Sequence, residues 1–197
     1  MIRTADPDLQ RRRSSEIAIA AARVFLAKGF HGASMQDVAR EAGVSMGLLY
    51  RYFEDKAALI AAAATIDRAS MLAEIAELGE VADPLAGLEA LLASIEVTAL
   101  EPGYVDLVTE VAAEACRNPR VAAVLKEDEL ELYTALVAAL TRQQAAGRLR
   151  ADADLASFAL LYLTLADALA LRLRFEPEQP IAPLISVFSP SIRALKP

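Results

Sequence analysis

The chain has 197 residues, a formal net charge of −7 and a hydrophobic fraction of 55%. This length predicts one or two domains with a core large enough to fold without disulfides or metals. The single cysteine, Cys116, excludes an intramolecular disulfide framework. Much of the apolar excess is alanine and leucine, both strong helix formers. The composition therefore predicts an all-α soluble protein.

Charge is distributed unevenly along the chain. Residues 1–56 contain 9 Lys or Arg and 7 Asp or Glu, a net charge of +2, whereas residues 57–197 carry a net charge of −9. The basic part includes the cluster Arg11–Arg13. Such a cluster permits nucleic-acid binding without demanding it, because basic clusters are more often solvated helix ends.

Two apolar stretches resemble targeting segments. Glu16 and Arg23 interrupt the run that follows Arg11–Arg13, so we expect an amphipathic helix there rather than a signal peptide. Ala156–Leu171 is shorter than the roughly 20 residues of a membrane span and contains Asp167, which favours a core or interface helix. We therefore expect a cytoplasmic protein that does not cross a membrane.

Hydrophobic periodicity, capping residues and prolines predict a series of helices. The first is expected at about 8–28, ending at Gly29, and two short helices follow at about 35–42 and 46–52. Longer helices are expected at about 55–78, 84–100, from 102 and from 119, with a boundary or short kink at Asn118-Pro119. Further helices are expected at 127–146, 152–175 and 182–195.

The segment Ser34–Lys56 carries the pattern of a helix-turn-helix. Two short helices that pack at a steep angle need a small residue where they approach, and Ala39 supplies it. Gly43 allows a positive φ in the turn. An apolar underside is expected from Val38, Ala42, Val44, Leu49 and Phe53.

With this underside buried, one face of the second short helix is free for a DNA major groove. That face consists of Met46, Gly47, Leu48, Tyr50 and Arg51. Gly47 lets the helix N-terminus approach a phosphate, Tyr50 suits a phosphate and sugar contact, and Arg51 suits a guanine or a phosphate. Further contacts to the DNA backbone are expected from Lys56, Ser34 and Gln36. The alternative is an ordinary helical hairpin, but solvated faces rarely combine tyrosine, glycine and leucine.

Residues from about 17 to 62 resemble the N-terminal domain of the TetR family of transcriptional regulators. The resemblance rests on Ala21 to Phe25, Gly29-Phe30, Ser34, Val38-Ala39, Ala42-Gly43-Val44-Ser45, Gly47, Leu49-Tyr50-Arg51-Tyr52-Phe53, Asp55-Lys56 and Leu59. It implies a helical dimer of about nine helices, an operator with inverted repeats and a ligand pocket in the C-terminal domain. It also implies that DNA is contacted by Gly47, Tyr50, Tyr52 and Lys56, with help from Ser34. Met46 departs from the pattern, because relatives often carry lysine, arginine or proline there, and the operator sequence is therefore left open.

We expect a DNA-binding domain at residues 1–56 and a helical ligand-binding and dimerisation domain at residues 57–197. The second part carries no motif. Polar residues embedded in its apolar stretches are candidate anchors for an apolar or amphipathic effector. They are Tyr104, Glu110, Glu114, Tyr133, Thr164 and Asp167. For each, a hydrogen-bonded core or surface residue is the alternative.

Two apolar stripes near the C-terminus are expected to form a two-fold dimer interface. The first stripe consists of Phe158, Leu161, Tyr162, Leu165, Leu169 and Leu173. The second consists of Ile181, Leu184, Ile185 and Phe188. The alternative is that both stripes pack within one chain.

No nucleophile–base pair, metal-ligand spacing or phosphate-binding glycine loop is visible, so we expect no enzyme activity, cofactor or metal. Cys116 is either a small core residue or a redox sensor. The function expected is a ligand-responsive regulator, a repressor released from its operator when a shift of the helix from Lys56 to Leu78 changes the spacing of the two recognition helices. The alternative is a helical adaptor that does not bind DNA.

Overall fold

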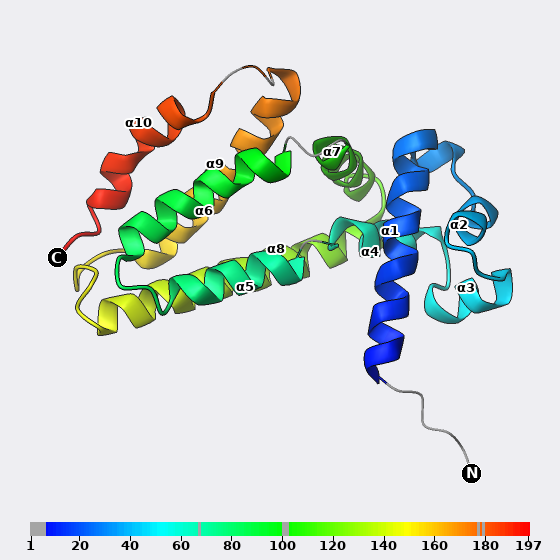
Figure 1. Ribbon diagram of the computed structural model, residues 1–197, viewed down its shortest axis with the longest axis horizontal. Coiled ribbons are helices and arrows are strands. Elements are labelled where there is room, and N and C mark those ends of the chain that lie inside the picture. Colours follow the sequence, from blue (N-terminus) through cyan, green and yellow to red (C-terminus); the bar gives the residue numbers. More distant parts are fainter. Residues whose placement is uncertain (1–6, 67, 100–102, 177, 179) are drawn as a thin grey trace, which may run out of the picture. The chain divides into compact units, whose positions relative to one another are not determined.

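The computed structural model describes residues 7–66, 68–99, 103–176, 178 and 180–197. These residues form helices and no strand, which confirms the expected all-α class. The helices (Figure 1) are α1 (Pro7–Gly32), α2 (Met35–Glu41), α3 (Met46–Tyr52), α4 (Lys56–Ala64), α5 (Arg68–Leu78), α6 (Pro84–Ala99), α7 (Tyr104–Ala115), α8 (Pro119–Ala145), α9 (Leu155–Phe175) and α10 (Ala182–Arg193).

The chain divides into two compact units. The first runs to residue 66 and includes residues 106–127, so it holds α1 to α4, most of α7 and the start of α8. The second holds residues 67–105 and 128–197. The division expected between residues 56 and 57 lies inside the first unit, because α4 packs against α1. The chain also passes from one unit to the other inside α7 and inside α8.

The core of the first unit is built on one face of α1. Ile17, Ala21 and Phe25 are buried there, and the ring of Phe25 meets the ring of Phe30 edge to face at 4.8 Å between centroids. Gly29 has a positive φ of 67° and interrupts the regular helix at the place where the sequence predicts its end. This break allows Phe30 to turn back onto α1.

The core of the second unit lies where α6 packs against α9 and α10 (Figure 1). Leu88 and Leu92 on α6 and Tyr162 on α9 are buried there. The buried Gln143 of α8 donates through Nε2 to the carbonyl oxygens of Leu78 (2.7 Å) and Val81 (3.0 Å). This side chain therefore satisfies the carbonyl of the last residue of α5 and one carbonyl in the loop that follows it.

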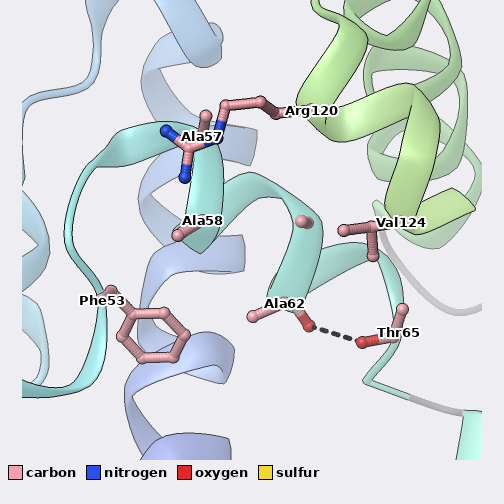
Figure 2. A pocket seen from close by; sticks show the side chains of 8 residues that line it. Phe53, Ala57, Ala58, Ala62, Thr65, Arg120 and Val124 are labelled. Carbon is pink, nitrogen blue, oxygen red and sulfur yellow. Dashed lines mark hydrogen bonds between the residues drawn. The ribbon is translucent and has the colours of Figure 1, made fainter.

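Two helix predictions are wrong. The helix expected at 55–78 is interrupted: α4 ends at Ala64 and α5 begins at Arg68. The Thr65 hydroxyl donates to the carbonyl of Ala62 (3.3 Å), and the Thr65 backbone N–H bonds to the same carbonyl (3.3 Å), closing the last turn (Figure 2). By contrast, the helices expected from 119 and at 127–146 form one continuous helix, α8, whereas the boundary expected at Asn118-Pro119 is present between α7 and α8.

Candidate nucleic-acid interface

The start of α2 is fixed by a reciprocal cap between Ser34 and Asp37. The Asp37 N–H donates to the Ser34 hydroxyl oxygen (3.2 Å), and the Asp37 carboxylate accepts from the Ser34 N–H (3.1 Å) and hydroxyl (2.7 Å). Lys28 of α1 lies 2.7 Å from the same carboxylate. The hydrogen bonds from Lys28 and Ser34 lower the pKa of Asp37 to about 2. The cap thus joins α2 to α1.

The turn between α2 and α3 has the geometry that the sequence predicts. Gly43 has a φ of 63°, and the Val44 N–H donates to the carbonyl of Ala39 at 3.0 Å. Ser45 caps α3 by accepting from the Leu48 N–H at 3.2 Å. Ala39 is only 4% exposed, so its small side chain lies in the packed contact. The expected underside is present, with Val38, Leu49 and Phe53 buried and Ala42 and Val44 half-buried.

The opposite face of α3 is open. Tyr50 is 51% exposed, and Gly47 and Arg51 are exposed beside it. A Cβ added at Gly47 would meet no atom within 4 Å, and its φ is not positive. Neither packing nor backbone conformation therefore requires glycine at this position. Its lack of a side chain matters only for a molecule that approaches from outside.

The other expected DNA contacts on α3 are less exposed. Met46 and Tyr52 are half-buried and pack against the core of the first unit, and Leu48 is also half-buried. The Arg51 guanidinium lies over the Tyr52 ring at 5.6 Å and forms no ion pair with any residue that the structure describes. Arg51 is therefore the charge on this face that is open to an anion.

Three of the expected backbone contacts lie outside α3. The Lys56 ammonium donates to the carbonyl oxygens of Phe30 (2.5 Å) and Ala33 (3.1 Å), so it holds the end of α1 against the start of α4. The hydroxyl hydrogen of Ser34 is used by Asp37. Gln36 is exposed on α2. For Lys56 and Ser34, a phosphate contact has to share or replace a hydrogen bond that supports the fold.

The start of α8 is joined to the turn between α3 and α4 by a link that the sequence analysis missed. Arg120 forms ion pairs with Glu54 and, at 2.5 Å, with Asp55. Asp55 also caps α4 by accepting from the Ala58 N–H at 2.9 Å, and this bond, aided by Arg120, lowers the pKa of Asp55. Figure 2 shows Arg120 reaching from α8 toward the start of α4, beside a pocket of about 350 Å³. The partners are more than sixty residues apart in sequence, so local patterns carry no sign of them.

The second unit contains its own pocket, with a volume of about 260 Å³. Its walls come from α5, α6 and α9 together with Tyr104, and they consist of Ser70, Met71, Glu74, Ile75, Leu91, Ser94, Ile95, Thr98, Tyr104, Tyr162, Leu163, Ala166, Asp167 and Ala170. Two of the six expected ligand anchors, Tyr104 and Asp167, line it. Glu74 and Ser94 also line the pocket, and neither was among the six expected ligand anchors.

The other four expected anchors lie elsewhere. Tyr133 is half-buried against the core of the second unit. Thr164 is exposed, and its hydroxyl donates to the Leu160 carbonyl at 2.8 Å. Glu110 is exposed in the first unit, where Glu114 accepts a hydrogen bond from Asn118 at 3.2 Å. These residues do not line the pocket of the second unit.

The residues expected to form a dimer interface are mostly turned inward. Phe158, Tyr162, Leu169 and Leu173 are buried in the second unit, and Leu165, Ile185 and Phe188 are half-buried against the same core. Ile181 is also buried, and the exceptions are Leu161, at 52% exposure, and Leu184, at 41%. Both sides of α9 are apolar, so helical periodicity does not distinguish the side that packs within one chain from the side that is left for another chain.

The exposed side of α9 forms a second apolar stripe. Its members are Leu160, Leu161, Thr164, Ala168, Leu171 and Phe175, which share one face at helical spacing. We call this set the outer stripe of α9. Residues Leu155–Leu173 have a mean hydropathy of 1.5, which by length and composition also suits a membrane span; core and interface helices of soluble proteins meet the same criterion.

Cys116 is exposed and unpaired with another cysteine, which removes the expectation of a small core residue. In the described part of the chain, no group of three or more His, Cys, Asp or Glu is arranged to hold a metal ion.

A capped two-helix unit with one buried face and one open face defines a helix-turn-helix DNA-binding protein. Residues 17–63 match the family described as bacterial regulatory proteins, tetR family. The HTH-type transcriptional regulator UidR of Escherichia coli (strain K12) is 32% identical over 155 residues, which cover 77% of this chain and 76% of UidR. The chain therefore belongs to the tetR family, and it is a transcriptional regulator rather than an enzyme.

Solved structures agree with this assignment. Salmonella enterica GusR superposes with a TM-score of 0.76 and 27% identity, covering 98% of this chain and 97% of GusR. FadR of Bacillus subtilis, solved in complex with stearoyl-CoA, has a TM-score of 0.71 and 18% identity, over 91% of this chain and 96% of FadR. At that identity the likeness to FadR shows the fold alone.

Proposed function

We propose that this regulator is a cytoplasmic homodimeric repressor that binds an operator with inverted repeats and releases it when a small molecule occupies the second unit. The observation that carries the proposal is Gly47, a glycine with open space where a side chain would stand. It lies beside the exposed Tyr50 and Arg51 on α3. A surface shaped for close approach and flanked by a phenol and a guanidinium suits the DNA backbone and base edges.

The outer stripe of α9 supports a dimer of two copies of this chain. Leu160, Leu161 and Phe175 are each more than half exposed, and Val187 on α10 is 79% exposed. An apolar surface of this kind is costly in water, and a two-fold interface covers it with the same surface of the second copy. Two half-sites about 34–36 Å apart then correspond to one turn of B-DNA.

The proposed release uses the helices that pass between the units. α4 ends at Ala64, so it is not one rigid rod with α5. α8 is continuous from the first unit into the second, and Arg120 at its start holds the turn between α3 and α4. An effector that favours one position of α8 shifts the recognition helix through Arg120, to the extent that it binds one arrangement more tightly.

Gel-shift titration with the DNA that flanks the gene of this chain tests DNA binding against the adaptor alternative. We expect a shift whose affinity falls steeply as salt rises, because phosphate contacts release counterions. Arg51→Ala is expected to weaken binding, whereas Arg193→Ala, which removes the same charge from α10, leaves it nearly unchanged. No shift at low salt, or equal loss in both variants, contradicts the proposal.

Light scattering on the full chain tests the dimer. We expect twice the chain mass, and a largely monomeric Leu161→Glu variant that keeps its helical content. A wild-type chain that remains monomeric at micromolar concentration, or a dimer unaffected by Leu161→Glu, contradicts the assignment of the outer stripe of α9.

A further inference from the structure

Five hydroxyl side chains line the pocket of the second unit, and three of them, those of Tyr162, Thr98 and Ser94, already donate their hydrogens within the protein. Tyr162 donates to the carbonyl of Leu88 at 2.7 Å, and Thr98 donates to the carbonyl of Ser94 at 3.3 Å. The Ser94 hydroxyl lies 2.9 Å from the carbonyl of Leu91 and 3.3 Å from the carboxylate of Glu74. A hydroxyl has one hydrogen, so these three oxygens are left mainly as acceptors.

The charged groups in the walls have the same polarity. Glu74 and Asp167 line the pocket, and none of the lining residues is Lys, Arg or His. Glu74 receives at most the longer of the two Ser94 contacts. Asp167 has neither a hydrogen bond nor an ion pair to any residue that the structure describes. Both carboxylates are therefore available to a ligand.

The surroundings add to the negative potential. Burial raises the pKa of Asp167, and burial together with the charge of Asp167 raises the pKa of Glu129 on α8. The nearby cation, Arg68, is paired with Asp128 and Glu131. A bound cation would relieve the repulsion between Asp167 and Glu129.

The rest of the lining is apolar. Met71 and Ile75 on α5, Leu91 and Ile95 on α6 and Leu163 on α9 form the walls. The pocket is also lined by Tyr104 and Tyr162, and an aromatic ring face attracts a cation. The volume of about 260 Å³ is just below the usual range of about 300–1,000 Å³ for ligand pockets. The pocket therefore suits a small ligand with an apolar body.

We infer that this pocket binds an organic cation with N–H donors, a protonated amine or guanidine on a small apolar body. N–H donors of the ligand pair with the acceptor oxygens of the pocket, and its positive charge pairs with the carboxylates of Glu74 and Asp167. A hydrocarbon or aromatic part packs against the apolar walls. An anionic ligand places its charge against two carboxylates, and a neutral alcohol gains no charge attraction from them. This inference names the effector class and so rests on the proposed function.

Four probes that share one alkyl chain separate the contributions of charge, N–H donors and apolar surface to binding in this pocket. Octylamine has charge and donors, octyltrimethylammonium has charge alone, octanol is neutral and octanoate is anionic. Calorimetric titration of the full-length chain is expected to rank octylamine first, at least about tenfold tighter than octanol, with octanoate the weakest. Octylamine that does not bind, or octanoate or octanol that binds as tightly, overturns the inference. Equal binding of octyltrimethylammonium overturns the requirement for N–H donors.

Matched variants locate the site. Asp167→Asn and Glu74→Gln are each expected to weaken octylamine about tenfold while leaving octanol unchanged. Glu77→Gln, which removes a charge from the exposed face of α5, is the control and is expected to bind as the wild type does. Circular dichroism melting verifies that each variant is folded, and either pocket variant suffices if the other unfolds. Wild-type affinity in both pocket variants overturns the inference.

Gel shifts keep this result separate from the proposed function. If octylamine binds but does not release DNA, the effector class stands and the ligand-controlled release fails. If DNA binding is intact and octylamine does not bind, the regulator stands and the cationic effector is wrong.

Discussion

Gly47→Ala is expected to separate DNA binding from stability. The added Cβ meets no atom of the chain within 4 Å, and the backbone there is helical, so the fold accepts alanine without strain. Alanine is preferred to glycine inside a helix by about 0.5–1 kcal/mol. Because Gly47 lies near the end of α3, this value is an upper bound on the stability that the substitution adds. The melting temperature should therefore stay the same or rise by up to roughly 4 °C for a chain of this size.

The same methyl group is expected to weaken the operator complex. It stands where the start of α3 would approach the duplex, and losing one hydrogen bond to a charged group costs about 1.5–3 kcal/mol. That corresponds to roughly tenfold to a hundredfold in Kd for each half-site. Gel-shift titration and thermal melting of one preparation measure both quantities.

Gly43→Ala is the matched control for a loss of stability, because Gly43 has a φ of 63° and any side chain at this position strains the backbone. It should cost about 1–2 kcal/mol of stability. The reasoning about α3 is refuted if Gly47→Ala binds the operator as tightly as the wild type, or if it melts as early as Gly43→Ala.

Three further predictions concern the first unit. Ala39→Leu overfills a buried contact and should cost about 1–3 kcal/mol, a fall of roughly 2–12 °C in melting temperature; unchanged melting would show that the turn is assigned wrongly. The pKa of Asp37 is lowered from 3.8 to about 2, so its carboxylate stabilises the fold above about pH 4 and this contribution is lost as the pH falls toward 2. Urea unfolding of Asp37→Asn should therefore show less loss of stability in that window than the wild type, and an equal loss would exclude Asp37 as a source. Arg120→Gln breaks exposed ion pairs, so it should leave the melting temperature nearly unchanged but reduce effector-induced release of DNA; normal release would remove Arg120 from the proposed route.

The helix-turn-helix could be predicted from sequence because its determinants are local. Ser34 and Ser45 cap the two helices, Gly43 supplies the positive φ, and Ala39 supplies the small contact, all within a dozen residues. Each of these residues acts on neighbours that lie in the same short segment. The bounds of α3 were accordingly predicted to the residue.

Features that depend on distant packing were harder to predict. The alanine-rich run of α4 contains no glycine or proline, so the residue types that most often end a helix do not mark its end at Ala64. On α9, Leu161 and Leu165 are equally apolar, and only the position of α6 decides which side is covered. Glu74 was not singled out from the sequence, because the pocket exists only after α5, α6 and α9 have come together.

The most direct test of the central claim is the operator affinity of the wild-type chain and of Tyr50→Ala, measured by gel shift at low and moderate salt. We predict a salt-sensitive complex that Tyr50→Ala weakens while its melting temperature is unchanged, because Tyr50 is 51% exposed and is absent from the core of the first unit. A wild-type affinity for Tyr50→Ala, or a loss of affinity that merely follows unfolding, would contradict the placement of the DNA contact on α3.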